Sequence, residues 1–175
     1  MPNENHTNNK AVLTITHEFS ASRELVFDAY SDAGSLVEWW GPVGYKLTVL
    51  SLEFQPKGLF HYKMENEQRV MWGRFIYGKI ERPELIEFTL SFSDEAGGIT
   101  RAPFFKNWPL EIFNELILTK KNGKTIATLT CYPINATKEE VASFQANKHS
   151  FYGGLSATNN QLELYLEKVQ RQSLK

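Results

Sequence analysis

The sequence predicts an α+β protein in which a curved antiparallel sheet of six to seven strands packs on one side against helices. Three features of the 175-residue chain predict this class: one alternating strand followed by two short helical segments, a long run of strand patterns, and one long C-terminal helix. The length and a hydrophobic content of 42% suit a single domain with a sizeable core. We expect a polar, disordered leader over residues 1-10, one domain over 11-170 and a tail over 171-175.

The N-terminal elements follow from local patterns. Residues Val12–Phe19 alternate between apolar and polar side chains, which is typical of a strand. Ser22 is a good N-cap for a helix that runs to about Tyr30. A second short helix is expected over Ser35–Trp40, ended by Gly41-Pro42, because proline disfavours helix in the residue before it.

The middle of the chain reads as six strands, over about 45–54, 59–65, 70–80, 85–93, 110–120 and 124–132. Asn122-Gly123 suits a tight hairpin turn, in which both central residues take positive φ. The long segment Asp94–Pro109 has no strand pattern but is rich in aromatic side chains. Long loops in compact domains often form lids or binding loops.

The final helix begins with a capping box formed by Thr137 and Glu140, and we expect it to reach about Val169. A rod of this kind is about 48 Å long, enough to cross a whole sheet. Its apolar stripe is interrupted by two polar residues, Lys148 and Asn159. In addition, Gly153-Gly154 in mid-helix indicate a bend or a close approach to the sheet.

The clustered aromatic residues leave two interpretations open, a filled core or the wall of a ligand pocket. For Lys148, the alternatives are an amine that reaches the rim and an amine that contacts a ligand. The candidate ligand-binding residues are Trp39, Trp40, Phe60, Tyr62, Met64, Trp72, Phe92, Phe104, Trp108, Phe144, Lys148, Phe151, Leu155 and Asn159.

Motifs of metal, phosphate or nucleophile chemistry are not found in the sequence. We therefore expect no metal and no cofactor, and catalytic residues stay unknown. Glu53, Glu111 and Glu115 alternate with apolar residues and are expected to face solvent, although one turned inward would be a candidate general base. A net charge of -1 argues against nucleic-acid or anionic-membrane partners. The single cysteine, Cys131, favours a cytoplasmic location, and a homodimer stays open.

Several segments, taken in order, resemble one known family. They span about residues 12–169 and comprise 19–27, 39–42, 73–80, 82–89, 93–97, 108–111, 152–158, Gln161-Leu162 and Tyr165-Leu166. The chain resembles the START-like or SRPBCC (Bet v allergen-like) superfamily. Within it, the chain is similar to the C-terminal domain of activators of the ninety-kilodalton heat-shock chaperone ATPase. It departs from the usual pattern at Glu53, Gln55 and Lys57-Gly58, and at Asn159, which would make a pocket more polar.

The resemblance implies the helix-grip fold, a curved sheet around the C-terminal helix with an elongated cavity between them. The first function that it implies is binding of a small hydrophobic or amphipathic molecule, as a carrier or sensor. A cyclase- or hydrolase-type enzyme, of the polyketide cyclase or dehydratase kind, is the second. A chaperone ATPase cofactor linked to the stress response is the third.

Overall fold

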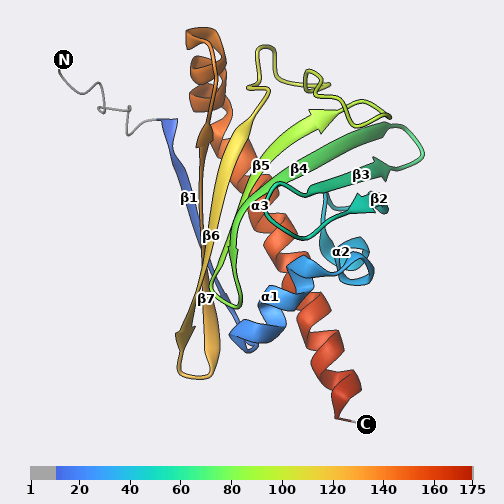
Figure 1. Ribbon diagram of the computed structural model, residues 1–175, viewed down its shortest axis with the longest axis vertical. Coiled ribbons are helices and arrows are strands. Elements are labelled where there is room, and N and C mark those ends of the chain that lie inside the picture. Colours follow the sequence, from blue (N-terminus) through green and yellow to red (C-terminus); the bar gives the residue numbers. More distant parts are fainter. Residues whose placement is uncertain (1–10, 175) are drawn as a thin grey trace, which may run out of the picture.

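The computed structural model describes residues 11–174 as a seven-stranded antiparallel sheet and three helices (Figure 1). This confirms the α+β helix-grip fold, while the expected leader, residues 1–10, lies outside the described residues. The strand order is β1-β7-β6-β5-β4-β3-β2. The elements are β1 (Leu13–Phe19), α1 (Arg23–Ser31), α2 (Ala33–Trp39), β2 (Lys46–Leu52), β3 (Leu59–Glu65), β4 (Val70–Glu81), β5 (Leu85–Ser93), β6 (Ile112–Lys121), β7 (Lys124–Pro133) and α3 (Lys138–Ser173).

Each helix begins at a side chain that accepts a hydrogen bond from a backbone N–H of the first turn. Ser22 Oγ accepts from the Leu25 N–H of α1 at 3.2 Å. Asp32 does the same for Ser35 at 2.9 Å, so α2 starts before the predicted Ser35. The capping box of Thr137 is present at the start of α3, which continues past the predicted end to Ser173.

The sheet curves around α3, which crosses its concave face diagonally (Figure 1). Two irregularities of strand register, between Val49 and Ser51 and between Tyr77 and Ile80, fall in the half of the sheet nearest α2. Such bulges increase local twist and bend a sheet. The hairpin between β6 and β7 turns at Asn122 and Gly123, both with positive φ as predicted.

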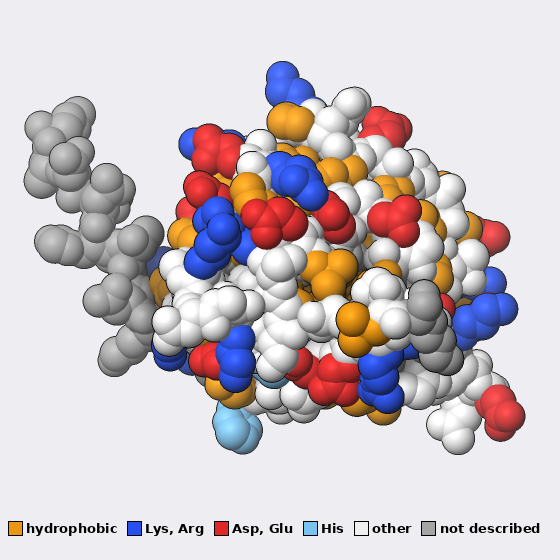
Figure 2. Space-filling model, turned by 90° about the horizontal axis from the view of Figure 1, so that it is seen from below, with side chains coloured by type: hydrophobic (Ala, Val, Ile, Leu, Met, Phe, Trp, Pro, Cys, Tyr) orange, Lys and Arg blue, Asp and Glu red, His pale blue; other side chains and the backbone are white. Residues whose placement is uncertain are grey.

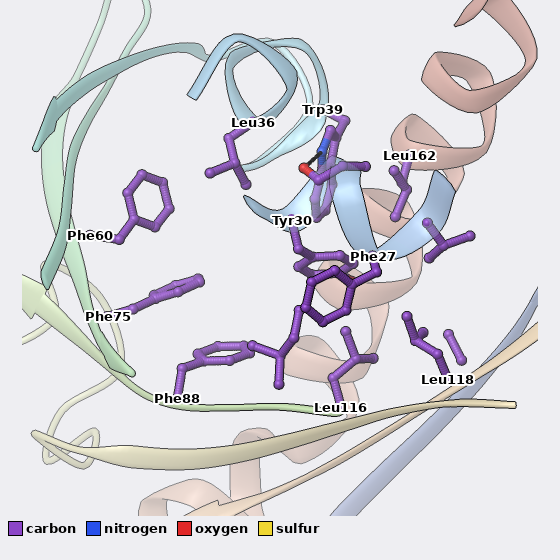
Figure 3. Packing of buried hydrophobic residues seen from close by; sticks show 14 of the residues in the cluster. Phe27, Tyr30, Leu36, Trp39, Phe60, Phe75, Phe88, Leu116, Leu118 and Leu162 are labelled. Atoms are coloured by element: carbon purple, nitrogen blue, oxygen red, sulfur yellow. Dashed lines mark hydrogen bonds between the residues drawn. The ribbon is translucent and has the colours of Figure 1, made fainter. Parts of the chain in front are cut away.

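Two apolar clusters fill different halves of the concave side. The larger joins α1, α2 and the C-terminal half of α3 to the sheet (Figure 3). In it, the indole N–H of Trp39 donates to the Ala29 carbonyl at 3.1 Å, and Tyr30 packs edge-on against the indole. The smaller cluster lies near the start of α3 and comprises Leu13, Trp108, Ile112, Cys131 and Phe144.

Acidic and basic side chains alternate over the end of the molecule seen from below, with small apolar areas between them (Figure 2). This interspersion agrees with the net charge of -1. Within residues 11–174, no helix is both long and apolar enough to span a membrane.

Candidate functional site

A cavity of about 340 Å³ lies where the two apolar clusters meet, beside the middle of α3. Its walls come from β3, β4, β5 and α3, from the turn after α2, and from the long loop between β5 and β6. The lining residues are Trp40, Gly41, Pro42, Tyr62, Met64, Met71, Gly73, Leu90, Ser91, Phe92, Phe104, Phe105, Trp108, Pro109, Ile112, Ser150, Phe151, Gly154, Leu155 and Thr158.

The burial of α3 changes along its length in a way that follows the cavity. Phe144 and Leu162 are completely buried, each in a different cluster. Between them, Phe151 and Leu155 are only half-buried, because they border the cavity instead of packing against the sheet. The helix is therefore fixed at both sides of the cavity, and its middle forms one wall.

The mouth of the cavity is marked by lining residues that are exposed to solvent. Pro42 belongs to the turn after α2, Phe104 to the long loop, and Ser150 and Gly154 to α3. These three segments surround the opening. A side-chain atom added at Gly154 would meet nothing within 4 Å, so the expected close approach of this part of α3 to the sheet is not found.

One polar part of the wall is formed by Tyr62, Trp40 and Gly73. Tyr62 is 2% exposed, and its hydroxyl lies over Gly73, where a β-carbon would come within 2.5 Å of the oxygen. Burial raises the pKa of Tyr62 well above its ordinary value, and the neighbouring Trp40 indole offsets part of this effect. Trp40 Nε1 is nevertheless shielded from solvent without a hydrogen-bond partner among the described residues.

The long loop between β5 and β6 is held in place by hydrogen bonds at several points. Arg101 donates to the Trp108 carbonyl and pairs with the buried carboxylate of Glu140, both at 3.3 Å. Ser143 Oγ donates to the Lys106 carbonyl at 2.8 Å, which ties the loop to α3. These contacts keep the aromatic residues of the loop over the cavity. Within this loop, the backbone of Phe105 has a positive φ of 52°, which is unfavourable for a residue with a side chain.

Eight of the residues predicted from the sequence line the cavity: Trp40, Tyr62, Met64, Phe92, Phe104, Trp108, Phe151 and Leu155. Three others pack around it without lining it. Trp39 and Phe60 are fully enclosed in the larger cluster, and Phe144 stacks beside Trp108 in the smaller one, at 5.6 Å between ring centroids.

The remaining three predicted residues lie elsewhere. Trp72 is on the opposite face of β4, because Met71 and Gly73 on either side of it face the cavity. Lys148 donates from Nζ to the Val12 carbonyl at 3.2 Å, and so holds the start of the described chain against α3. Asn159 is half-buried on α3 and does not reach the cavity.

Several lining residues lie outside the predicted set. For Met71, strand alternation is the signal: on β4 it shares a face with Phe75 and Tyr77, whereas its neighbour Trp72 lies on the other face. Small residues at the mouth carry no such signal, because a glycine or serine is equally common on any surface. Leu90 and Phe105 lie on the apolar strand and in the aromatic loop that the sequence already pointed to. The other lining residues outside the predicted set are Gly41, Pro42, Gly73, Ser91, Pro109, Ile112, Ser150, Gly154 and Thr158.

The described lining residues include no Asp, Glu, His, Lys, Arg or Cys. Glu53 is exposed, and Glu111 and Glu115 lie outside the cavity. Cys131 is buried in the smaller cluster, where burial raises its pKa to about 12 and keeps it a thiol. Within residues 11–174, no group of three or more His, Cys, Asp or Glu side chains is placed to hold a metal ion.

Comparison with known families places the chain. Residues 20–167 match the family described as Activator of Hsp90 ATPase homolog 1-like protein. The chain belongs to this family. No curated protein matches the sequence.

Solved structures similar to this member of the Activator of Hsp90 ATPase homolog 1-like family share its architecture over nearly the whole chain. A crystal structure from Mycobacterium smegmatis has 25% identity and a TM-score of 0.73, and the match covers 90% of this chain and 91% of that one. A solution structure from Arthrobacter aurescens has 22% identity and a TM-score of 0.76, over 91% and 87%. Another from Staphylococcus epidermidis has 24% identity and a TM-score of 0.73, over 90% of each chain.

Proposed function

We propose that this protein binds a small hydrophobic molecule in the cavity beside α3, as a carrier or a sensor. The observation that carries the proposal is a cavity of about 340 Å³ whose walls are largely aromatic and aliphatic. Ligand sites of globular proteins have volumes of about 300–1,000 Å³ and are mostly apolar with a few polar groups. Membership of a START-like family supports the same function, since relatives of this fold commonly bind hydrophobic molecules.

The closure of the cavity also supports binding. Phe104 is 38% exposed although it stacks edge-on against Phe92 and Phe105. A ring at the mouth of an apolar cavity gains contacts when the cavity is filled, because it then packs against the ligand instead of water. The positive φ of Phe105 fits this role, since strained backbone conformations cluster at ligand clamps.

An enzyme of the cyclase or hydrolase type is the second candidate for the same cavity. Its support is weaker, because the described lining residues offer no carboxylate or imidazole as a general base. Tyr62 is the titratable group in the wall, and burial holds it protonated at neutral pH. A chaperone cofactor is the third candidate and rests on the family description alone.

The test of binding is native mass spectrometry of freshly purified protein, followed by titration with apolar dyes. We expect a small molecule at less than one per protein, which dissociates from the protein on collisional activation in the mass spectrometer. An organic extract of the purified protein should displace the dye. Gly154→Leu serves as the blocking variant, because the new side chain would extend from α3 over the mouth. The dye affinity of this variant should fall at least tenfold.

Gly153→Leu is the matched control. Gly153 is also exposed on α3 with nothing within 4 Å of an added β-carbon, but it does not line the cavity. The control should bind the dye as the wild type does. Equal losses in both variants, or dye binding that neither variant changes, would place the apolar site outside this cavity and contradict the proposal.

A further inference from the structure

The cavity is lined by uncharged residues, and two nearby cationic side chains contact other groups of the protein. None of the described lining residues carries a charge. Lys148 donates to the carbonyl of Val12, and Arg101 pairs with Glu140 behind the loop. A carboxylate inside the cavity would therefore be buried without a counter-ion, which is strongly unfavourable. Anionic ligands such as fatty acids are excluded by this argument.

The same wall contains hydroxyl groups that can recognise a polar atom, on Tyr62, Ser91, Ser150 and Thr158, of which Thr158 already donates to backbone carbonyls. The Tyr62 hydroxyl lies at the cavity wall over Gly73, and both residues line the cavity. Residue 73 has to be glycine for the hydroxyl to lie there, because any β-carbon would overlap the oxygen. Within the described residues, this hydroxyl is not seen to donate a hydrogen bond. A phenol can donate one hydrogen bond and accept others.

Trp40 lies beside Tyr62 in the same wall. Its ring meets that of Tyr62 edge-on, at 6.3 Å between centroids and an angle of 89°. Its indole N–H can only donate. It is buried close enough to the Tyr62 oxygen to lower the pKa of that phenol, but it makes no hydrogen bond of ordinary geometry in the described part of the chain. Buried N–H groups are nearly always satisfied in folded proteins, so a poorly formed contact of this kind in a cavity wall favours an arrangement that a ligand completes.

We infer that the cavity selects an uncharged, mainly apolar ligand with one hydrogen-bond acceptor, such as a ketone or ester oxygen, which accepts a hydrogen bond from the Tyr62 hydroxyl. When the hydroxyl points to the ligand, its oxygen faces Trp40 and accepts from the indole N–H. One ligand atom then satisfies both side chains. This inference rests on the proposed function and defines the class of molecule that the site takes.

The experiment compares three probes of nearly equal shape by isothermal titration calorimetry at neutral pH. They are 2-acetylnaphthalene, 2-ethylnaphthalene, in which a methylene replaces the carbonyl, and 2-naphthoate. We expect the ketone to bind about tenfold more tightly than the hydrocarbon, the ratio that one additional hydrogen bond gives. The carboxylate should bind at least roughly a hundredfold more weakly than the ketone.

Tyr62→Phe removes the hydroxyl and keeps the ring. In this variant the ketone and the hydrocarbon should bind equally, while the affinity for the hydrocarbon stays within about twofold of the wild type. Tyr30→Phe is the control, because Tyr30 is a buried phenol on α1 that does not line the cavity. The control should retain the full preference for the ketone.

The outcomes distinguish a failure of the inference from a failure of the function on which it rests. Equal binding of ketone and hydrocarbon to the wild type would leave a hydrophobic binding protein and overturn the role of Tyr62. Tightest binding of 2-naphthoate would overturn the exclusion of anions. If none of the probes binds to the wild type, the proposed function fails together with the inference.

Discussion

Gln161 on α3 donates a hydrogen bond from Nε2 to the carbonyl oxygen of Gly41 at 2.8 Å, and this bond links α3 to the turn after α2. The same amide donates to the Trp39 carbonyl at 3.2 Å, and Thr158 Oγ1 adds a contact to Gly41 at 3.3 Å. Together these bonds fix the segment that carries Trp40 and Pro42 into the cavity wall.

Gln161→Leu should therefore destabilise the fold and loosen this wall. The substitution leaves the Trp39 carbonyl without its side-chain donor and removes one of two donors from Gly41. Loss of such bonds costs about 1–2 kcal/mol in the free energy of unfolding. Urea denaturation monitored by circular dichroism measures it. Gln172→Leu, at the exposed end of α3, is the control and should change the stability by less than about 0.5 kcal/mol.

The two glycines in the middle of α3 should be replaceable with a gain in stability. Gly153 and Gly154 are both exposed, and a β-carbon at either position meets nothing within 4 Å. Alanine restricts the unfolded chain and favours helix, so each single change should raise the free energy of unfolding by about 0.5–1 kcal/mol. Thermal denaturation gives the comparison. A fall in melting temperature for either variant would mean that α3 needs glycine there for bending.

Glu140 should make stability depend on acid. Burial by itself raises its pKa, but hydrogen bonds from the Leu110 and Thr137 backbone, the Thr137 hydroxyl and the charge of Arg101 lower it further, so the net pKa is below the ordinary value. Because the pKa of Glu140 is lower in the folded state, the unfolded chain binds more protons at this carboxyl at pH values around its two pKa values. The stabilisation is complete above about pH 4.3, the unfolded value, and is lost as the pH falls through the folded-state pKa.

Glu140→Gln should accordingly be less stable at pH 7 by about 1–3 kcal/mol, and its stability should fall less steeply between about pH 5 and pH 3. Urea midpoints measured across this range test both parts. Glu139→Gln alters a carboxylate in the same turn that is exposed, and should behave as the wild type. An identical pH slope in the wild type and Glu140→Gln would show that other carboxylates control acid unfolding.

Cys131 should be unreactive in the folded protein. It is completely buried, and a pKa of about 12 leaves almost no thiolate, which is the reactive form, at neutral pH. Labelling with a disulfide reagent at pH 8 should be slow without urea and should accelerate in parallel with unfolding. Rapid labelling of the native protein would show that the smaller apolar cluster opens on its own.

The elements could be predicted because local signals determine them. Ser22 and Thr137 act on the backbone next to them, and Asn122-Gly123 needs only its own φ angles. The site was predictable where strand alternation decides the face, as for Tyr62 and Met64 on β3. The same reasoning applied to β4 would have excluded Trp72 in favour of Met71.

The rest of the site depends on contacts between distant segments, which no local pattern encodes. One partner of Lys148 is the backbone carbonyl of Val12, and any residue type at that position offers the same oxygen. The place of Gly73 is determined by the hydroxyl of Tyr62 on the neighbouring strand. Such pairs become visible only when strand register is known.

The strand order has a consequence for how the protein is made. Leu13 of β1 pairs with Cys131 of β7. All other neighbouring strands of the described sheet are consecutive in the sequence. Synthesis from the N-terminus therefore produces β1 long before its partner exists, with Leu13, Ile15 and Phe19 still lacking the surface that buries them. Closing this large loop is entropically slow. The edge strand that begins the described chain is thus expected to be among the last to join the sheet during synthesis.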